Sequence, residues 1–414
     1  MKHYRIMFLL LIGAITLSAL SLLKTTAEPP PIQSTLHELR KFAEQNNDFG
    51  IELYHRLRTQ PGNVFFSPYS ISTALAMVST GARNQTEAQM LKCLHLGTDQ
   101  KLNTTLHRDL MTSMLHQPKG YEIRIANALW GQNAHPFKAD FVTGLQHSFR
   151  AEGRTLDFAG EAEQSRTIIN QWVEAQTNQR IKNLLPSGSI TGLTRLVLTN
   201  AIYFKGTWQT PFSKSATRPG DFFITSDDKV KAEMMARTAS MRYAENDLFQ
   251  ALELPYAGDR LSMVILLPRK RNNLGEAESQ LSSGMVSQLV QKMTSPKVIL
   301  SLPRIKTTYE KPLKTTLVSM GMTDAFEAGI ADFSGIDSTR ELYISEVYHK
   351  AFCEINEEGT EAAAATAVAM VEYSTPSKQP PPVEFKADHP YLYLIRDRQT
   401  GSILFMGRVV DPRQ

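Results

Sequence analysis

Residues 357–382 read EEGTEAAAATAVAMVEYSTPSKQPPP, and this stretch decides how the rest of the chain is organised. Its first half consists largely of small side chains, without interruption over residues 362–369. Its second half is polar and then rich in proline, beginning at Pro376. A run without bulky side chains can pass between the strands of a close-packed sheet, whereas proline lacks the N–H donor that a sheet interior requires. The stretch therefore predicts an insertable segment that ends before Pro376.

Two simpler interpretations fit part of this composition. Alanine is the strongest helix former, so the run could form a surface helix. The β-branched residues Thr366, Val368 and Val371 weaken that interpretation. Small residues and prolines are also typical of linkers, which cannot bury much surface. The absence of bulky side chains favours the insertable segment over both.

The sequence around this run resembles one protein family. Residues 357–367 are similar to the hinge of the reactive-centre loop of an inhibitory serpin, and the whole loop corresponds to residues 357–382. The flanking motifs VYHKA at 347–351 and LFMGR at 404–408 match the same family. The resemblance runs from about residue 48 to residue 412, and it implies a single α+β domain with three mainly antiparallel β-sheets, about eight to nine helices and an exposed reactive-centre loop.

Patterns along the rest of the chain favour the same fold class. Ser67 and Pro68 form an N-cap followed by proline, and residues 71–78 after them are apolar nearly all round, which predicts a buried helix. Helical and strand patterns follow one another without strict alternation, which favours α+β with large, mainly antiparallel sheets. Helical spacing occurs at 36–57 and 168–173, and strands are predicted for 123–130, 196–204, 222–225, 251–254, 261–267, 298–302 and 342–347.

The N-terminus sets the domain organisation. Residues 1–27 have a basic start, an apolar run over 6–23 and small residues near Ala27, which is the pattern of a secretory signal peptide. A retained anchor is the alternative, because the apolar run is almost long enough to span a bilayer. Residues 28–46 are expected to be a leader with the start of the first helix, and 47–414 a single domain. The chain is therefore predicted to be secreted and extracellular, without membrane contact once the signal is cleaved.

Composition excludes several classes of function. The net charge of +4 is too small to indicate nucleic-acid binding, and 42% hydrophobic residues are ordinary for a globular protein. Cys93 lies in a helical pattern and Cys353 in an alternating strand, so both are predicted to be free, buried thiols. Cys/His metal spacings are absent, as are GxSxG, HExxH and GxxxxGK[ST]. We therefore expect no cofactor, no metal and no enzymatic activity.

Two sequons mark candidate glycosylation sites. They begin at Asn84 and Asn103, and they matter in a host that glycosylates secreted chains. Thr86 in the first sequon has a competing interpretation, because with Gln89 it forms a capping box for the helix that holds Met90.

Glycosaminoglycan binding is allowed by the fold that the resemblance implies. In the relevant region basic residues are sparse, which is typical of an ordinary solvated surface and too little to predict such a site. They are Lys92, Lys101, Arg108 and Lys119.

The resemblance also implies roles for polar and aromatic residues under the central sheet. Residues of the serpin shutter, where strands part, match Ser67, Ser70, Asn200 and His349. A polar cluster there could hold two strands together and re-pair when they separate. Without the resemblance, Ser67 is a helix cap and His349 a buried histidine satisfied by backbone groups. Trp208 matches the tryptophan of the breach at the top of that sheet, and Arg304 a basic position that pairs with Glu357.

The loop itself is the expected site of action. Its hinge comprises Glu357, Gly359, Thr360, Glu361, Ala362, Ala363, Ala364 and Ala365. In inhibitory serpins the attacked bond follows the seventeenth residue counted from the hinge glutamate, which gives the bond between Tyr373 and Ser374. Tyrosine suits the hydrophobic primary pocket of a chymotrypsin-like protease. The stretch from Ser374 to His389 is longer than in many serpins, so Lys378 is an alternative trypsin-type site and Met370 an elastase-type site.

The resemblance thus implies an inhibitor that acts as a monomer and a suicide substrate. The target serine protease forms a covalent acyl complex with the cleaved loop, and the hinge inserts into the sheet. A non-inhibitory carrier or chaperone is the alternative, but such serpins commonly have bulky, charged or proline residues in the hinge, and residues 359–369 include only Glu361 of that kind. A secreted hydrolase is a further alternative from another class, without a catalytic motif to support it.

Overall fold

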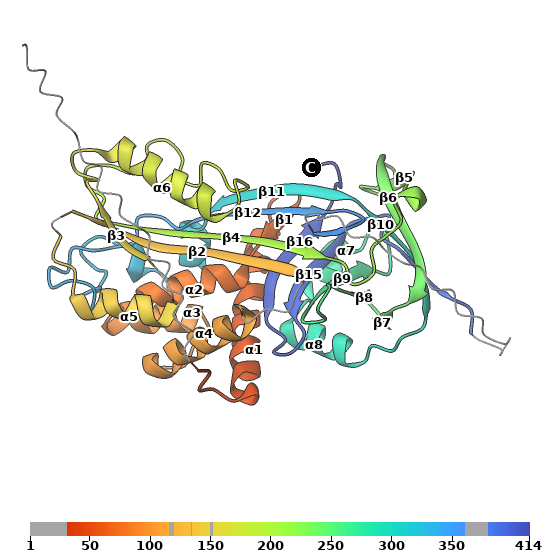
Figure 1. Ribbon diagram of the computed structural model, residues 1–414, viewed down its shortest axis with the longest axis horizontal. Coiled ribbons are helices and arrows are strands. Elements are labelled where there is room, and N and C mark those ends of the chain that lie inside the picture. Colours follow the sequence, from red (N-terminus) through yellow and green to blue (C-terminus); the bar gives the residue numbers. More distant parts are fainter. Residues whose placement is uncertain (1–30, 116–119, 134, 150–151, 361–379) are drawn as a thin grey trace, which may run out of the picture. The chain divides into compact units, whose positions relative to one another are not determined.

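The apolar runs of the chain fold into three β-sheets with helices packed around them (Figure 1). The computed structural model describes residues 31–115, 120–133, 135–149, 152–360 and 380–414. Residues 32–414 form a single compact unit. Within the described ranges the α-helices are α1 (Leu36–Leu57), α2 (Pro68–Ser79), α3 (Asn84–Cys93), α4 (Gln100–Leu115), α5 (Ala139–Phe149), α6 (Ala162–Gln176), α7 (Leu274–Ser279), α8 (Ser283–Gln291) and α9 (Lys314–Ser319).

Most neighbouring strands are antiparallel, as the sequence predicts. The order is β11-β12-β13-β4-β2-β3 in one six-stranded sheet, which we call the central sheet, β1-β16-β15-β9-β8-β7 in the other, and β14-β10-β6-β5 in a four-stranded sheet. Parallel pairs join β2 to β3, β4 to β12 and β10 to β14. The strands are β1 (Val64–Phe66), β2 (Tyr121–Gln132), β3 (Glu152–Leu156), β4 (Leu196–Thr207), β5 (Arg218–Phe223), β6 (Lys229–Ser240), β7 (Arg242–Glu245), β8 (Phe249–Pro255), β9 (Leu261–Pro268), β10 (Lys297–Pro303), β11 (Ile305–Pro312), β12 (Tyr348–Ile355), β13 (Gly359–Thr360), β14 (Val383–Lys386), β15 (Tyr391–Asp397) and β16 (Ile403–Val409).

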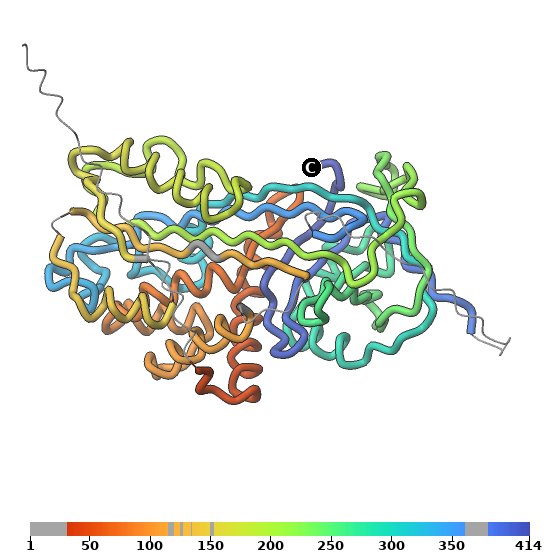
Figure 2. The backbone as a smooth tube through the Cα atoms, viewed as in Figure 1, coloured from red at the N-terminus to blue at the C-terminus, as the bar shows by residue number. Residues whose placement is uncertain are grey.

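Helices cover both faces of the central sheet. Figure 1 shows α6 on one face, against β2 and β4, and α2 to α5 on the other. All twelve residues of α2 are buried, and the Ser67 side chain accepts a hydrogen bond from the Ser70 N–H at its start, so the predicted cap and the predicted burial are both confirmed. Figure 2 shows that β1 lies beside β16 from the other end of the chain, and the two strands pair antiparallel.

The alternating run 342–347 is not a strand, contrary to the sequence prediction. Leu342, Ile344 and Val347 are buried, with more exposed residues between them, but the segment joins no sheet. Its backbone is satisfied elsewhere, because Ile344 donates to the Ala325 carbonyl at 2.8 Å. An extended segment that runs along the core alternates in burial as a strand does, so the pattern alone cannot distinguish the two.

The predicted capping box of Thr86 and Gln89 is also wrong. Helix α3 starts at Asn84, and its N-cap is Arg83. Thr86 therefore lies within the first turn and is buried, and its hydroxyl accepts from the Asp332 N–H at 2.9 Å. A tertiary contact has replaced the local one that the spacing suggested.

Both cysteines are buried and are not joined by a disulfide, as predicted. The signal peptide predicted for residues 1–27 lies outside the described ranges. Among the helices within those ranges, none has the length and the apolar character needed to cross a membrane.

Candidate functional site

The hinge already enters the central sheet at its first two residues. Strand β13 lies between β12 and β4 and is antiparallel to both, with Thr360 opposite Ile355 on one side and Gly206 on the other. The Thr360 side chain is buried, and its hydroxyl lies 2.7 Å from the hydroxyl of Tyr256. Thr360 is thus a member of the sheet before any cleavage of the loop.

Gly359 makes this entry sterically feasible. Its φ of +154° lies in a region that residues with a side chain rarely adopt, and an added Cβ would lie 1.9 Å from the Gly206 carbonyl oxygen. Its carbonyl also accepts from the Asn356 N–H at 2.9 Å, which closes the turn after β12. A side chain here would push the hinge out of the sheet.

Two glutamates fasten the chain just before β13. Glu357 is buried, and its carboxylate accepts hydrogen bonds from Arg304 at 2.5 to 3.0 Å and from the Thr217 hydroxyl. The Glu358 carboxylate pairs with the exposed Lys214 at 2.6 Å. Burial alone would raise the pKa of Glu357, but the hydrogen bonds from Arg304 and Thr217 outweigh it and hold the pKa below its ordinary 4.5. The pair that the sequence suggested is therefore formed, and its carboxylate is buried.

We expect Glu357→Gln to destabilise the protein by about 1 to 2 kcal/mol at neutral pH, because charge-assisted bonds to a buried carboxylate are lost. Since the folded pKa is lowered, this stabilisation is complete above 4.5 and is lost as the pH falls through the folded value. The measurement is urea unfolding of both proteins across that range. Glu358→Gln is the matched control and should cost little, because its partner is exposed. Equal losses in the two variants would contradict the prediction.

A stacked pair of aromatic side chains packs beside the hinge and bonds to it. The Trp208 ring stacks on Tyr256 with centroids 4.7 Å apart and planes 11° apart. Trp208 also donates from its ring nitrogen to the Asn356 carbonyl and from its backbone to the Glu358 carbonyl, both at 2.9 Å. The breach tryptophan suggested by the resemblance therefore touches the hinge directly. Tyr256, which bonds Thr360, carries no sequence pattern that would have revealed it.

The four shutter residues meet under the central sheet, and all are buried. The Asn200 amide nitrogen lies 2.7 Å from the Ser70 carbonyl and 2.5 Å from its hydroxyl, and the Ser67 hydroxyl donates to the Leu404 carbonyl at 2.6 Å. His349 accepts from the Ser67 N–H at 3.2 Å through Nε2, so Nδ1 carries the proton and faces the Asn200 oxygen at 3.4 Å. Burial lowers the pKa of His349 to about 3, so the ring is neutral.

Asn127 is a fifth member that the sequence did not reveal. It lies opposite Asn200 on β2, and its side-chain oxygen accepts from the Asn200 amide at 2.7 Å. Its own amide nitrogen is buried without a partner among the described residues. In the sequence Asn127 reads only as part of a strand, because nothing marks which asparagine faces inward. The cluster thus joins β2, β4 and β12 to the start of α2.

The remainder of the predicted loop site lies outside the described residues. This covers Glu361, Ala362, Ala363, Ala364, Ala365, Met370, Tyr373, Ser374 and Lys378.

The two sequons differ in exposure. Asn84 is exposed, and its amide donates to Asp332 at 2.8 Å. Asn103 is buried in α4, and its amide nitrogen donates to the Gly97 carbonyl at 2.7 Å. A glycan on that nitrogen is incompatible with this geometry, so the prediction for Asn103 needs correction.

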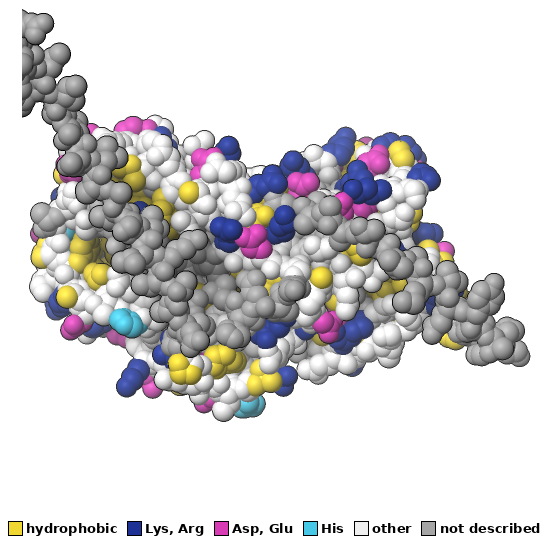
Figure 3. All heavy atoms as spheres, viewed as in Figure 1, with side chains coloured by type: hydrophobic (Ala, Val, Ile, Leu, Met, Phe, Trp, Pro, Cys, Tyr) yellow, Lys and Arg dark blue, Asp and Glu magenta, His cyan; other side chains and the backbone are white. Residues whose placement is uncertain are grey.

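Among the described residues of the region where a glycosaminoglycan would bind, basic side chains are not concentrated. Lys92 and Lys101 are exposed, Arg108 is paired with Asp109 at 2.9 Å, and Lys119 lies outside the described ranges. On the face in Figure 3, Lys and Arg side chains lie among Asp and Glu. The described residues also contain no cluster of His, Cys, Asp and Glu that could hold a metal ion.

Comparisons with known proteins agree on one family. The family model described as Serpin (serine protease inhibitor) matches residues 44–412. An uncharacterized serpin-like protein of Thermococcus kodakarensis is 42% identical over 89% of this chain and 85% of its own length. Human leukocyte elastase inhibitor is 36% identical, covering 90% of this chain and 100% of its own length. The solved structure of human thyroxine-binding globulin with thyroxine has a TM-score of 0.82 and 29% identity, covering 91% of this chain and 100% of that one.

Proposed function

The chain belongs to the serpin family, and from that membership we propose that it inhibits a chymotrypsin-like serine protease as a suicide substrate. The observation that carries the proposal is the position of β13, which holds the first hinge residues between β12 and β4. The likeness to human leukocyte elastase inhibitor supports it. In this role the chain is the substrate and trap of an enzyme and has no catalytic site of its own.

The register of β13 predicts the positions that the next hinge residues would take in the central sheet. Thr360 is opposite Gly206 and Ile355, so a continued antiparallel strand brings Ala362 and Ala364 to the same inner face and then Thr366 opposite both Asn200 and His349. The only hydroxyl in that part of the run thus arrives at the polar shutter cluster. Glu361 falls on the outer face, where a charge is tolerated.

The first part of this insertion does not require paired strands to separate. Strands β12 and β4 pair directly only from Tyr348–Ala351 with Thr199–Ile202. Residues 361–363 can therefore enter without separating any existing pair, and later residues must replace the parallel pairs. The shutter side chains lie at these pairs, so their hydrogen bonds resist opening until the new strand supplies its own.

The chemistry follows from an ordinary acyl transfer. The protease serine attacks the carbonyl of Tyr373, the amine of Ser374 leaves, and an ester joins the protease to Tyr373. Cleavage frees the hinge from the downstream chain, the hinge inserts, and the tethered protease moves with it. Its active site is distorted before water hydrolyses the ester. The intact protein is accordingly metastable, and the strain is released by cleavage.

A carrier without inhibitory activity is the second candidate, supported by the likeness to thyroxine-binding globulin. Mixing the protein with chymotrypsin, trypsin and elastase discriminates between the two. An inhibitor gives a complex that survives SDS, together with a released C-terminal peptide whose mass identifies the cleaved bond. Cleavage without a stable complex, by every protease tested, would support the carrier instead.

We expect Tyr373→Arg to redirect inhibition from chymotrypsin to trypsin, because the charged side chain no longer fits a hydrophobic primary pocket. The measurement is the second-order rate of inhibition of each protease, with an expected loss of about a hundred-fold or more for chymotrypsin. Lys378→Ala is the matched control and should leave both rates unchanged. A wild-type peptide that begins at Gln379 would instead identify Lys378 as the site.

The remaining proposals concern the setting in which the protein acts. The N-terminal pattern supports secretion, and we propose that the protein acts outside the cell as a monomer. The exposed Asn84 is the proposed glycosylation site, in a host that uses sequons.

A further inference from the structure

A buried histidine lies where three of the helices beside the central sheet meet. His107 of α4 is 2% exposed, and its ring stands at 83° to that of Phe42 of α1, with the centroids 4.7 Å apart. On another side Phe149, at the end of α5, lies 5.6 Å away. Both ring nitrogens are buried without a hydrogen-bond partner among the described residues. Such groups are rare in folded proteins, so the position of this ring requires an explanation.

The charged neighbours of His107 on its own helix are directed elsewhere. Asp109 faces the leader, and its carboxylate accepts from the backbone N–H groups of residues 33 and 34 at 2.9 and 2.8 Å. Arg108 pairs with Asp109 at 2.9 Å, and Lys101 is exposed. None of these groups therefore stabilises a proton on the buried ring.

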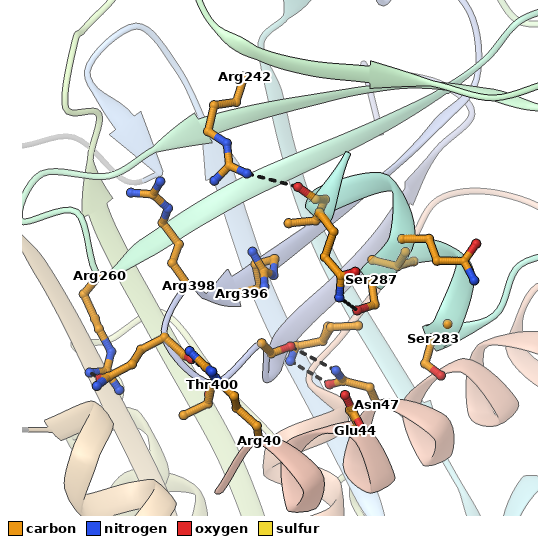
Figure 4. A pocket seen from close by; sticks show the side chains of 18 of the residues that line it. Arg40, Glu44, Asn47, Arg242, Arg260, Ser283, Ser287, Arg396, Arg398 and Thr400 are labelled. Atoms are coloured by element: carbon orange, nitrogen blue, oxygen red, sulfur yellow. Dashed lines mark hydrogen bonds between the residues drawn. The ribbon is translucent and has the colours of Figure 1, made fainter. Parts of the chain in front are cut away.

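The elements packed against α4 supply no compensating carboxylate among their described residues. Arg40 and Glu44 of α1 point into a hollow lined from α8 and from the turn between β15 and β16, and not from α4 (Figure 4). The other titratable groups near this end of α1, on α5 and on the start of β2 are exposed or paired with one another. They are Glu38, Lys41, Asp140, His147, Glu122 and Arg124.

Burial without a charged partner keeps the His107 ring neutral. It lowers the pKa of His107 from 6.5 to about 3, and the ordinary value returns when the ring meets water. Because the folded pKa is the lower one, the open form takes up a proton that the closed form does not. The stability of the closed form is therefore complete above 6.5 and is lost progressively as the pH falls from 6.5 towards 3.

We infer that His107 makes α4 an acid-released cover of the central sheet. A protonated ring needs water, which it reaches only when α4 separates from α1 and α5. Leu106 and Leu110 of α4 belong to the same apolar cluster as Tyr121 and Ile123 of β2. Release of α4 thus uncovers one side of the sheet in which the hinge pairs. This switch does not depend on whether the protein inhibits a protease.

The test is hydrogen exchange of the intact protein between pH 6.5 and 4.5, followed on the amides of α4 and corrected for the intrinsic exchange rate. One proton is taken up on opening, so the protection of α4 should fall by about ten-fold between pH 5.5 and 4.5. Asp109 does not contribute there, because its pKa is lowered from 3.8 and so lies below this range. His107→Gln should remove most of the fall. His147→Gln, at an exposed histidine of α5, is the matched control and should behave as the wild type does.

Melting curves establish that His107→Gln is folded, and His107→Phe, which keeps an aromatic ring, serves in its place if it is not. The buried His349 of the shutter is common to the wild type and all variants, so it cancels in the comparison. Helix α8, which contains no histidine, is the internal reference. An equal fall in the wild type and in the folded variant would overturn the proposal. A fall no greater in α4 than in α8, or an imidazole NMR titration of His107 near pH 6.5 in the folded wild type, would overturn it as well.

Discussion

Thr360→Arg should turn the protein from an inhibitor into a substrate of the same protease. The Thr360 side chain is buried in the central sheet and bonded to Tyr256, so an arginine there must be desolvated or must drive the hinge out of the sheet. Either outcome raises the barrier to insertion, and about 1.4 kcal/mol already slows a step ten-fold. The loop around Tyr373 is unchanged, so acylation proceeds and hydrolysis of the ester wins the competition.

The measurement is the ratio of SDS-stable complex to cleaved inhibitor, which should fall by about ten-fold or more. Glu361→Arg is the matched control, because the register directs residue 361 to the outer face of the sheet. It introduces arginine one position further along and should leave the ratio nearly unchanged. An unchanged ratio in Thr360→Arg would mean that insertion through this hinge does not trap the protease.

Cleavage of the loop should raise the melting temperature by about 20 °C. A strand of about ten residues that pairs on both sides gains on the order of ten net hydrogen bonds at roughly 1 kcal/mol each. In a large domain each kcal/mol shifts the midpoint by about 2 °C. The parallel pairs between β12 and β4 are lost in exchange, but the antiparallel strand that replaces them pairs with both neighbours.

Calorimetry of the intact protein and of protein nicked in the loop measures this directly. Nicked Thr360→Arg provides the control, since the buried arginine weakens the inserted strand and its melting temperature should rise less on cleavage than that of the wild type. Equal melting temperatures for intact and nicked wild type would favour a loop that never inserts, as in a carrier.

Local patterns predicted well wherever a residue's role depends on its immediate neighbours. The Ser67 cap and the apolar helix after it were predicted correctly. Both features depend on residues that are neighbours in the sequence. The continuous apolar runs of β4 and β9 identified strands for the same reason. The shutter, by contrast, came from family resemblance, because no spacing rule brings His349 beside Asn200.

The failures are of one kind, in which a contact outside the recognised motif decides the role of a residue. Thr86 bonds Asp332 instead of capping its own helix, and Asn103 faces inward to the Gly97 carbonyl. The segment 342–347 follows the core without joining a sheet. Tyr256 was missed because its importance comes from Trp208 on one side and Thr360 on the other, which only the fold brings together.

The short strand β13 also bears on how the chain folds. Its pairing with β12 closes a hairpin of a few residues, whereas the parallel pairing of β12 with β4 joins residue 348 to residue 199. Contacts between residues close in sequence form fastest. We therefore expect the β12–β13 hairpin to form before the parallel pairing of β12 with β4. Within the described residues the hairpin reaches Thr360, and β14, downstream of the loop, pairs with β10 on the four-stranded sheet. A chain made as two fragments, 1–373 and 374–414, lacks this tether and should assemble straight into the inserted state. Chain continuity would then determine which folded state is reached first.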